Sequence, residues 1–460
     1  MSIPKRSLAV IEKYLARYAE PEAAQALTLC ANIDTAPWQH CLCLPVYHEP
    51  LAYLQRLLDF IATQNHVLTI LVVNQPVCRT GPTTNPEWLQ QLSHTLSCAS
   101  MFGSQHLFLA NNNNAILCID RFSDAHRIAD KQGVGLARKI ASDTALALFT
   151  KGHHHSRWAH CCDSDTQLPA DYFSAIEKAL LAAGKSDEAI AACLYPFTHV
   201  ANGNATINHA HARYEERLQH YVDGLAAAGS PYAFHTLGSI LALNLSHYAA
   251  ARGFPRRNGA EDFYLLNKLN KLGQVLTLDS PVLRIDCRAS ARAPFGTGVA
   301  TSKLSAAESI DDEPLFYHPD IFNLLGELLT WQKSLARSLA TDASDEPIEG
   351  GLNRTSVVKN WAAHLQDFLQ HRQQSLAPVA ILQSMGFGTA INQCLQSNAN
   401  TEQLHYTIDC WFDGFRTLKF IHALRDHGFH DLSWHQLQES VIADNTVSAK
   451  SSDTHPSMAR

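Results

Sequence analysis

Two aspartates separated by a single serine are the residues of this chain best suited to carry chemistry. Asp163 and Asp165 follow an apolar run that begins at Trp158, and Pro169 then opens an amphipathic segment. The run is typical of a buried strand, and alternate residues of a strand share a face. Both carboxylates should therefore point to one place beyond the carboxyl end of a strand, where open α/β sheets bind ligands. Hard oxygen ligands suit Mg²⁺ or Mn²⁺, which keep coordination positions free for phosphate groups.

A zinc site is the alternative metal centre. It would combine one pair of cysteines within an apolar run, either Cys41 and Cys43 or Cys161 and Cys162, with nearby histidines, namely His153, His154, His155 and His160. No Cys-x-x-Cys spacing joins them, and adjacent residues of a strand point to opposite faces. Cysteine in an apolar run behaves as a small hydrophobic residue, so we expect free thiols rather than zinc ligands.

Composition excludes several classes of protein. The 460 residues are enough for two domains, and 46% apolar with 17% charged residues is the balance of a globular chain. The net charge is −7 and no block of Lys and Arg stands out, which disfavours nucleic-acid binding. Apolar runs are strand-sized, and the N-terminus is charged and amphipathic rather than a signal peptide. We therefore expect a cytoplasmic protein with no transmembrane segment and no nucleic-acid partner.

Strands alternating with helices should position the aspartates. Residues 40–46 and 67–73 are apolar runs typical of buried parallel strands, and an amphipathic segment at 51–63 separates them. A further strand is expected at 115–119. These strand–helix–strand steps predict an α/β fold with a mostly parallel sheet flanked by helices.

Two later segments place charged residues near helix starts. Gly133 and Gly135 open an apolar-faced helix that carries Arg138, and such a helix start can hold an anion. The third glycine of a dinucleotide-binding fingerprint is missing. Glu261 and Asp262 occupy the first turn of another helix, where acids are favoured by the helix dipole whatever the function.

Composition divides the chain into five regions. A helical extension is expected first, then the α/β domain, a polar linker, a second helical region and a disordered tail. Their expected bounds are 1–38, 39–300, 301–314, 315–436 and 437–460.

Four features follow one another along the α/β domain: a strand with Pro-x-Tyr-x-Glu, Gly-x-Gly-x-Ala-Arg opening a helix, a strand with Asp-x-Asp, and Gly-Ala-Glu-Asp opening a later helix. In this order they resemble the family 2 glycosyltransferases, enzymes of the GT-A fold, over about residues 40–300. The resemblance implies transfer of a sugar from a nucleotide-diphosphate sugar to an acceptor hydroxyl, usually with inversion. The matching stretches are Leu44–Glu49, Gly133–Arg138, Asp163–Asp165, Gly238–Ser239 and Glu261–Asp262.

The resemblance also implies roles for single residues. Asp165 would ligate the Mg²⁺ or Mn²⁺ that bridges the diphosphate, and Asp163 would contact the donor ribose or the water shell of the metal. Asp262 would be the general base, with Glu261 its neighbour at the acceptor side. The rest of the donor site would be Pro45, Tyr47, Glu49 and Asn74 around the nucleotide, with Arg138 near the phosphates.

The chain departs from the family pattern at two positions. Asn74 follows the second strand where members commonly carry an aspartate that holds the base. An asparagine pairs with a base edge but offers no charge, which leaves uridine and guanosine open as the donor nucleoside. Lys139 stands where members usually show the asparagine of Ala-Arg-Asn. The Gln-x-x-Arg-Trp motif of processive synthases is absent, so we expect transfer of one sugar to a soluble or small-molecule acceptor.

Two other functions stay open. A non-catalytic GT-A-like scaffold would bind a nucleotide-sugar, or a protein partner through the helical region. A nucleotidyltransferase typically needs a glycine-rich, lysine-containing loop after the first strand, and residues 45–50 do not provide one. For residues 315–436, shaping of the acceptor site and formation of a homodimer are both open.

Overall fold

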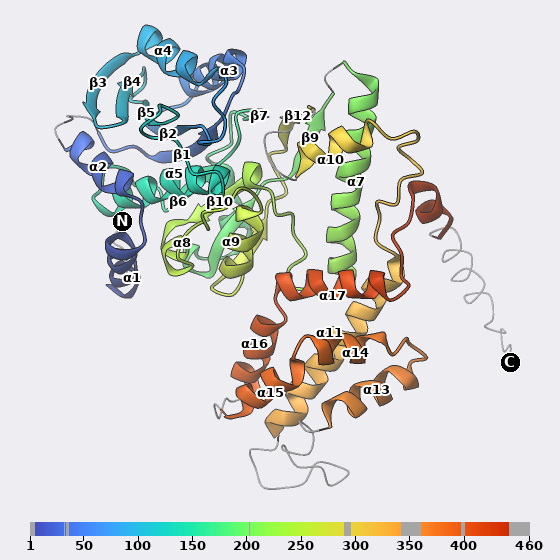
Figure 1. Ribbon diagram of the computed structural model, residues 1–460. Coiled ribbons are helices and arrows are strands. Elements are labelled where there is room, and N and C mark those ends of the chain that lie inside the picture. The colour runs from blue at the N-terminus through green and yellow to red at the C-terminus, as the bar shows by residue number, and fades with distance from the viewer. Residues whose placement is uncertain are drawn as a thin grey trace, which may run out of the picture. The chain divides into compact units, whose positions relative to one another are not determined.

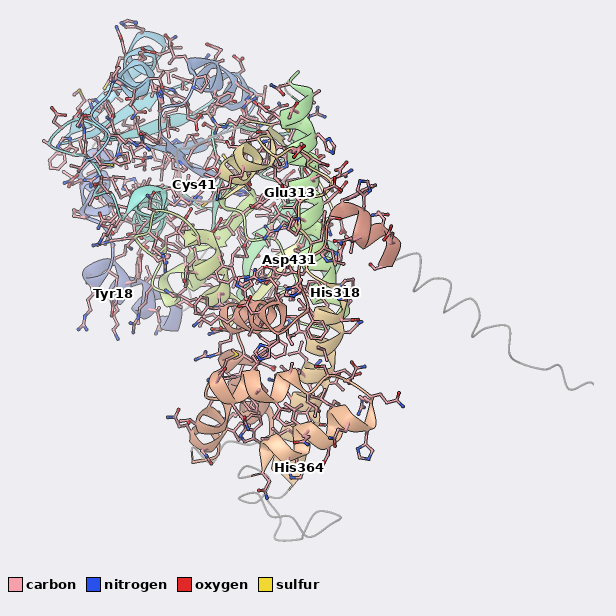
Figure 2. The ribbon with its side chains drawn as sticks, turned by 45° about the vertical axis from the view of Figure 1, so that its right-hand side comes forward. Tyr18, Cys41, Glu313, His318, His364 and Asp431 are labelled. Carbon is pink, nitrogen blue, oxygen red and sulfur yellow. The ribbon has the colours of Figure 1, made fainter. Side chains whose placement is uncertain are left out.

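The computed structural model describes residues 5–31, 33, 36–201, 203–288, 296–341, 360–396 and 401–440. The chain divides into two units. The first, the sheet unit, comprises Met1–His211 and Phe234–Ser302, and the second, the helical unit, comprises Ala212–Ala233 and Lys303–Arg460. Figure 1 shows strands in the sheet unit and helices throughout the later part of the chain, and Figure 2 marks Cys41 in the first unit and His318 in the second.

A nine-stranded sheet forms the core of the sheet unit. Its spatial order is β11-β8-β10-β6-β1-β2-β5-β4-β3. Every residue of β2 is buried, as the continuous apolar run predicts for a central strand. The strands are β1 (His40–Val46), β2 (Val67–Asn74), β3 (Ser97–Phe102), β4 (Gln105–Leu109), β5 (Ala115–Arg121), β6 (Trp158–Cys161), β8 (Ile190–Leu194), β10 (Leu241–Asn244) and β11 (Gln274–Thr277).

The sheet is mixed, so the prediction of a mostly parallel sheet is wrong in that respect. The pairs β1–β2, β1–β6, β2–β5 and β8–β11 are parallel. Strand β10 runs antiparallel to both β6 and β8, and β3–β4 and β4–β5 are antiparallel. The β3–β4 hairpin turns at Gly103, whose φ of 59° suits glycine, in a region that the sequence pattern leaves without regular structure.

Helix α5 (Gly133–Thr150) is buried along most of its length because it lies between two layers. It packs on β1 and β2 on one side, and on α1 (Lys5–Arg17) and α2 (Pro21–Cys30) on the other. The expected N-terminal extension is therefore helical, with a break where Pro21 opens α2. The other helices of the unit are α3 (Leu51–Ala62), α4 (Asn85–Thr95), α6 (Ala175–Ala183), α8 (Leu245–Ala250), α9 (Glu261–Leu269) and α10 (Thr297–Leu304), with short 3₁₀ turns at Asp187–Ala189 and Gly238–Ile240.

A second, three-stranded sheet lies beyond β6. Strand β12 (Leu283–Asp286) pairs antiparallel with β7 (Thr166–Gln167) and parallel with β9 (Phe197–Val200). The Asp286 amide donates to the Asp165 carbonyl at 3.1 Å. This pairing fixes the chain after β12 against the turn that carries the two aspartates.

The helical unit has its own apolar core, built around residues such as Leu325, Leu365 and Phe420. Helix α7 (Ala205–Ala227) runs from the sheet unit into this one. The unit's other helices are α11 (Pro319–Thr341), α13 (Trp361–His371), α14 (Ala377–Ser384), α15 (Phe387–Gln396), α16 (Thr401–Trp411) and α17 (Gly414–Asp426), as a helical region at 315–436 predicts. Residues 441–460 of the expected tail lie outside the described residues.

None of the helices within the described ranges is long and apolar enough to cross a membrane.

Candidate functional site

The sheet has a topological switch point between β1 and β6. From β1 the chain passes to β2 and β5 on one side and then returns to β6 on the other. At such a point the connections diverge and leave a crevice beyond the carboxyl ends of the strands, where ligands bind in α/β proteins. Glu49 follows β1 and Asp163 follows β6, so two of the candidate acids lie at this switch point.

Arg138 on α5 joins three of the stretches singled out in the sequence. Its guanidinium donates to Glu261 Oε1 at 2.9 Å, to the Gly238 carbonyl at 3.0 Å and to Asp163 Oδ1 at 2.7 Å. Both Arg138 and Glu261 are buried. Because its terminal nitrogens and Nε all donate to protein groups, Arg138 positions the acids around it.

Two glycines allow this close packing. A Cβ on Gly238 would lie 2.5 Å from the Arg138 guanidinium, and one on Gly135 would lie 2.5 Å from the Pro255 carbonyl oxygen. The Gly135 amide donates to the Arg257 carbonyl at 2.9 Å. Close packing against residues 255–257 therefore accounts for Gly135, and its amide is used within the chain itself.

Asp163 and Asp165 lie in the turn between β6 and β7, just beyond the strand end predicted for them. Different arginines bind them: Arg138 binds Asp163, and Arg288 binds Asp165 Oδ2 at 2.5 Å. The Asp163 side chain is 35% exposed and that of Asp165 13%. The two carboxylates thus stand at one turn but have different partners.

Arg288, just after β12, is the second centre of the site. It pairs with both carboxylate oxygens of Glu49, at 2.5 and 3.0 Å, as well as with Asp165. Its guanidinium lies 5.6 Å from the centre of the Tyr53 ring, and its backbone amide donates to His211 Nε2 at 2.9 Å. Local sequence pattern does not single out Arg288, because its partners are distant along the chain.

The charge balance around Asp165 favours a bound cation. Burial, together with the neighbouring carboxylates of Asp163 and Glu49, raises the pKa of Asp165 to about 6, although Arg288 acts in the opposite direction. The carboxylates of Asp163, Asp165 and Glu49 therefore have too little positive charge near them to balance their negative charge. A divalent ion with open coordination positions would relieve this shortage, so these residues fit Mg²⁺ or Mn²⁺. Within the described ranges, no group of three His, Cys, Asp or Glu side chains could hold a metal by itself.

Asp262 lies in the first turn of α9, next to Glu261. Burial and the adjacent Glu261 carboxylate raise the pKa of Asp262 to about 7, while Arg138 and the backbone amides of Phe263 and Gly238 oppose the shift. The carboxylate accepts from the Phe263 amide at 2.7 Å. A half-buried carboxylate with a pKa near neutrality is suited to take a proton from a substrate.

The remaining expected donor residues surround the end of β1. Pro45 is buried within β1, and Tyr47 is half-buried just after it. Asn74 is 4% exposed, its side-chain amide donates to the Val46 carbonyl at 2.9 Å, and its backbone carbonyl accepts from the Asn85 side chain. The side-chain nitrogen of Asn74 thus holds the end of β1.

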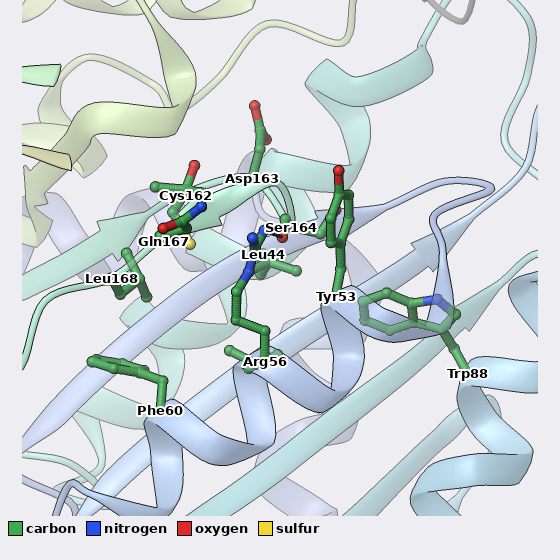
Figure 3. Close-up of a pocket in the computed structure, with 12 residues that line it drawn as sticks. Leu44, Tyr53, Arg56, Phe60, Trp88, Cys162, Asp163, Ser164, Gln167 and Leu168 are labelled. Carbon is green, nitrogen blue, oxygen red and sulfur yellow. Dashed lines mark hydrogen bonds between the residues drawn. The ribbon is translucent and has the colours of Figure 1, made fainter. Parts of the chain in front are cut away.

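A pocket that Asp163 helps to line lies under α3 and has a volume of about 490 Å³, open solvent at its mouth included. We call it the α3 pocket. Figure 3 shows Tyr53, Arg56 and Phe60 from one helix on one side and the turn after β6 on the other. The sequence pattern does not indicate this pocket, since its walls come from unremarkable helix positions. It is lined by Leu44, Tyr53, Arg56, Leu57, Phe60, Trp88, Cys162, Asp163, Ser164, Thr166, Gln167 and Leu168.

The cysteines proposed as an alternative zinc site are free thiols buried in the sheet: Cys41, Cys43, Cys161 and Cys162. Burial raises the pKa of the Cys162 thiol well above its usual value, which disfavours the thiolate that zinc requires.

Comparison with protein-family models gives no match to this chain, and comparison with curated proteins gives none either.

Proposed function

We propose that residues 39–300 form a metal-dependent inverting glycosyltransferase of the GT-A type, resembling family 2. It would move one sugar from a nucleotide-diphosphate sugar to an acceptor hydroxyl. The observation that carries the proposal is the convergence of Asp163, Gly238 and Glu261 on Arg138, at the crevice between β1 and β6. These residues come from separate stretches of the chain whose order carries the resemblance.

The reaction needs a base and a stabilised leaving group. The acceptor oxygen forms a bond to the anomeric carbon, its proton passes to Asp262, and the bond from that carbon to the diphosphate oxygen breaks with its electron pair on the diphosphate. A pKa of about 7 lets Asp262 accept this proton near neutral pH. Inversion requires one base and no covalent intermediate.

The acids at the crevice would hold Mg²⁺ or Mn²⁺. Asp165 would be the direct ligand, with Asp163 at the ribose or the water shell of the ion. When bound, the ion supplies positive charge that stabilises the leaving diphosphate. Glu261, which pairs with Arg138 at 2.9 Å, acts as a positioning residue that orients the start of α9.

A thermal-shift panel tests the proposal, using UDP-, GDP-, dTDP- and ADP-sugars with and without Mn²⁺. A ligand at a hundredfold excess over its Kd stabilises the folded state by about 2.7 kcal/mol. We expect one nucleotide class to stabilise the protein only with Mn²⁺, and Asp165→Ala to remove the effect. Asp124→Ala is the matched control because Asp124 is 92% exposed and lies outside the site. No response to any donor would contradict the proposal.

The non-catalytic scaffold and the enzyme differ in turnover. Once the donor class is known, turnover is measured as the release of nucleoside diphosphate from the sugar donor. With simple glycosides present the release reports transfer, and with water alone it reports slow hydrolysis. Donor binding without any release, in wild type and Asp262→Asn alike, would favour the scaffold.

A further inference from the structure

Three successive backbone amides at the end of β12 bond to three different parts of the chain. The Asp286 amide donates to a carbonyl of the turn after β6 at 3.1 Å, and the Cys287 amide donates to the Val200 carbonyl of β9 at 3.0 Å. The Arg288 amide donates instead to a side chain, His211 Nε2 on α7, at 2.9 Å. At Arg288 an imidazole therefore takes the place that a backbone carbonyl has at the two preceding residues.

His211 can hold the backbone of Arg288 in either tautomer of its ring. Its Nε2 also lies 3.1 Å from the Arg288 carbonyl oxygen. In one tautomer this nitrogen accepts from the amide, and in the other it donates to the carbonyl. His211 is 2% exposed, and its ring packs on that of His199 with the ring centres 4.9 Å apart. The imidazole thus connects α7, β9 and the residue after β12.

The side chain of Arg288 makes contacts that need precise placement. It pairs with both carboxylate oxygens of Glu49 and with Asp165. A planar guanidinium pairs with a carboxylate through two parallel bonds only within a narrow range of positions. A functional side chain must be held within about 0.5 Å of its working position by the groups around it. Because Arg288 lies beyond the end of β12, the bond from its backbone to His211 limits where the guanidinium can reach.

We propose that His211 is a positioning residue of the metal site, which fixes the backbone of Arg288 so that the guanidinium stays at Glu49 and Asp165 until a divalent cation binds there. This inference rests on the proposed function, in which Asp165 ligates Mg²⁺ or Mn²⁺. Without His211, Arg288 holds the two acids less firmly. The cation then meets less competition for their negative charge.

Binding of Mn²⁺ alone to the full chain, followed by electron paramagnetic resonance, tests the inference. His211→Leu removes the polar nitrogen, whereas His211→Gln keeps a side chain that both accepts and donates. His154→Leu is the matched control, because His154 is a fully buried histidine of the sheet unit whose Nε2 bonds to another backbone carbonyl, that of Ala145, at 2.7 Å. Thermal melts of each variant report its stability.

We expect His211→Leu to bind Mn²⁺ about twofold to tenfold more tightly than wild type, the factor that one buried hydrogen bond is worth. His211→Gln should bind Mn²⁺ as wild type does. His154→Leu should lower the melting temperature and leave the Mn²⁺ affinity unchanged. In a protein that already carries Arg288→Gln, adding His211→Leu should have no further effect, because His211 acts through Arg288.

The outcomes separate the failures. If His211→Leu binds Mn²⁺ as wild type does, or if its effect adds fully to that of Arg288→Gln, the inference is wrong while the proposed function stands. An equal rise in affinity in His154→Leu would also overturn the inference, since loss of any buried histidine would then have this effect. If neither wild type nor Arg288→Gln binds Mn²⁺, the inference and the proposed function both fail.

Discussion

Replacing Arg138 by methionine should destabilise the sheet unit strongly, because the substitution leaves Glu261 as a buried carboxylate without its cation. Both side chains of this pair are only 5% exposed. Removing one partner of a buried ion pair costs about 3 to 5 kcal/mol, and the lost bonds to Gly238 and Asp163 act in the same direction. For a unit of this size we expect the melting temperature to fall by about 10 °C.

The cost should depend on the charge of Glu261, because a buried carboxylate without a cation is unfavourable. Adding Glu261→Gln removes the charge, and the double variant should be more stable at pH 8 than the single one.

Differential scanning calorimetry of the full chain is the suitable assay, because the two units can unfold in separate transitions. Arg127→Met is the control: its partner Asp124 is 92% exposed, so the change should cost less than about 1 kcal/mol. Two results would refute the assignment of Arg138 as the central ion-pair partner. One is a melting temperature of Arg138→Met within about two degrees of wild type. The other is a double variant in which the losses of stability from Arg138→Met and Glu261→Gln are additive.

Three further predictions concern the acids and their partners. Asp262→Asn should abolish transfer and leave donor affinity nearly unchanged. In the wild-type enzyme, kcat should rise with pH through about 7 as Asp262 loses its proton. A kcat that does not change with pH would contradict the role of Asp262 as the base. Arg288→Gln should let Mn²⁺ bind more tightly in the absence of nucleotide, because Glu49 and Asp165 lose the guanidinium that they share. Electron paramagnetic resonance measures the Mn²⁺ affinity, and an unchanged affinity would count against a metal site at these acids. Asp143→Ala should lower stability by about 3 to 5 kcal/mol in calorimetry, because it breaks a fully buried cluster of polar groups.

That buried cluster explains one departure from the family pattern. Lys139 follows Arg138 on α5 and so points to a different side of the helix. Its ammonium donates to Asp143 at 2.9 Å and to the Tyr14 hydroxyl at 2.6 Å, and Tyr14 in turn donates to Asp143. Lys139 therefore ties the N-terminal helix α1 to α5. This role of Lys139 follows only from the structure, in which helices of the expected extension at 1–38 pack on α5.

Local pattern was sufficient for several elements around the site and insufficient for their partners. The buried strands at 40–46 and 67–73, the helix opened by Gly133 and the acids after β6 and at the start of α9 follow from periodicity and helix-start preferences. The reversal of β10 does not, since a four-residue apolar strand is compatible with either direction. The bonds of Arg138 and Arg288 join residues 25 to 239 positions apart, and no spacing rule covers such distances.

Asp163 and Asp165 pair with two arginines, Arg138 and Arg288, that differ in burial. Arg138 is buried on a central helix and bonds to Glu261 and Gly238 as well as to Asp163. Arg288 follows a short strand, is 24% exposed and shares its charge between Glu49 and Asp165. A cation at Asp165 would compete with Arg288 directly, and the displaced guanidinium would lie beside the diphosphate that arrives with that cation. One turn thus combines an aspartate paired with a buried arginine of the core and an aspartate paired with an arginine that is partly exposed.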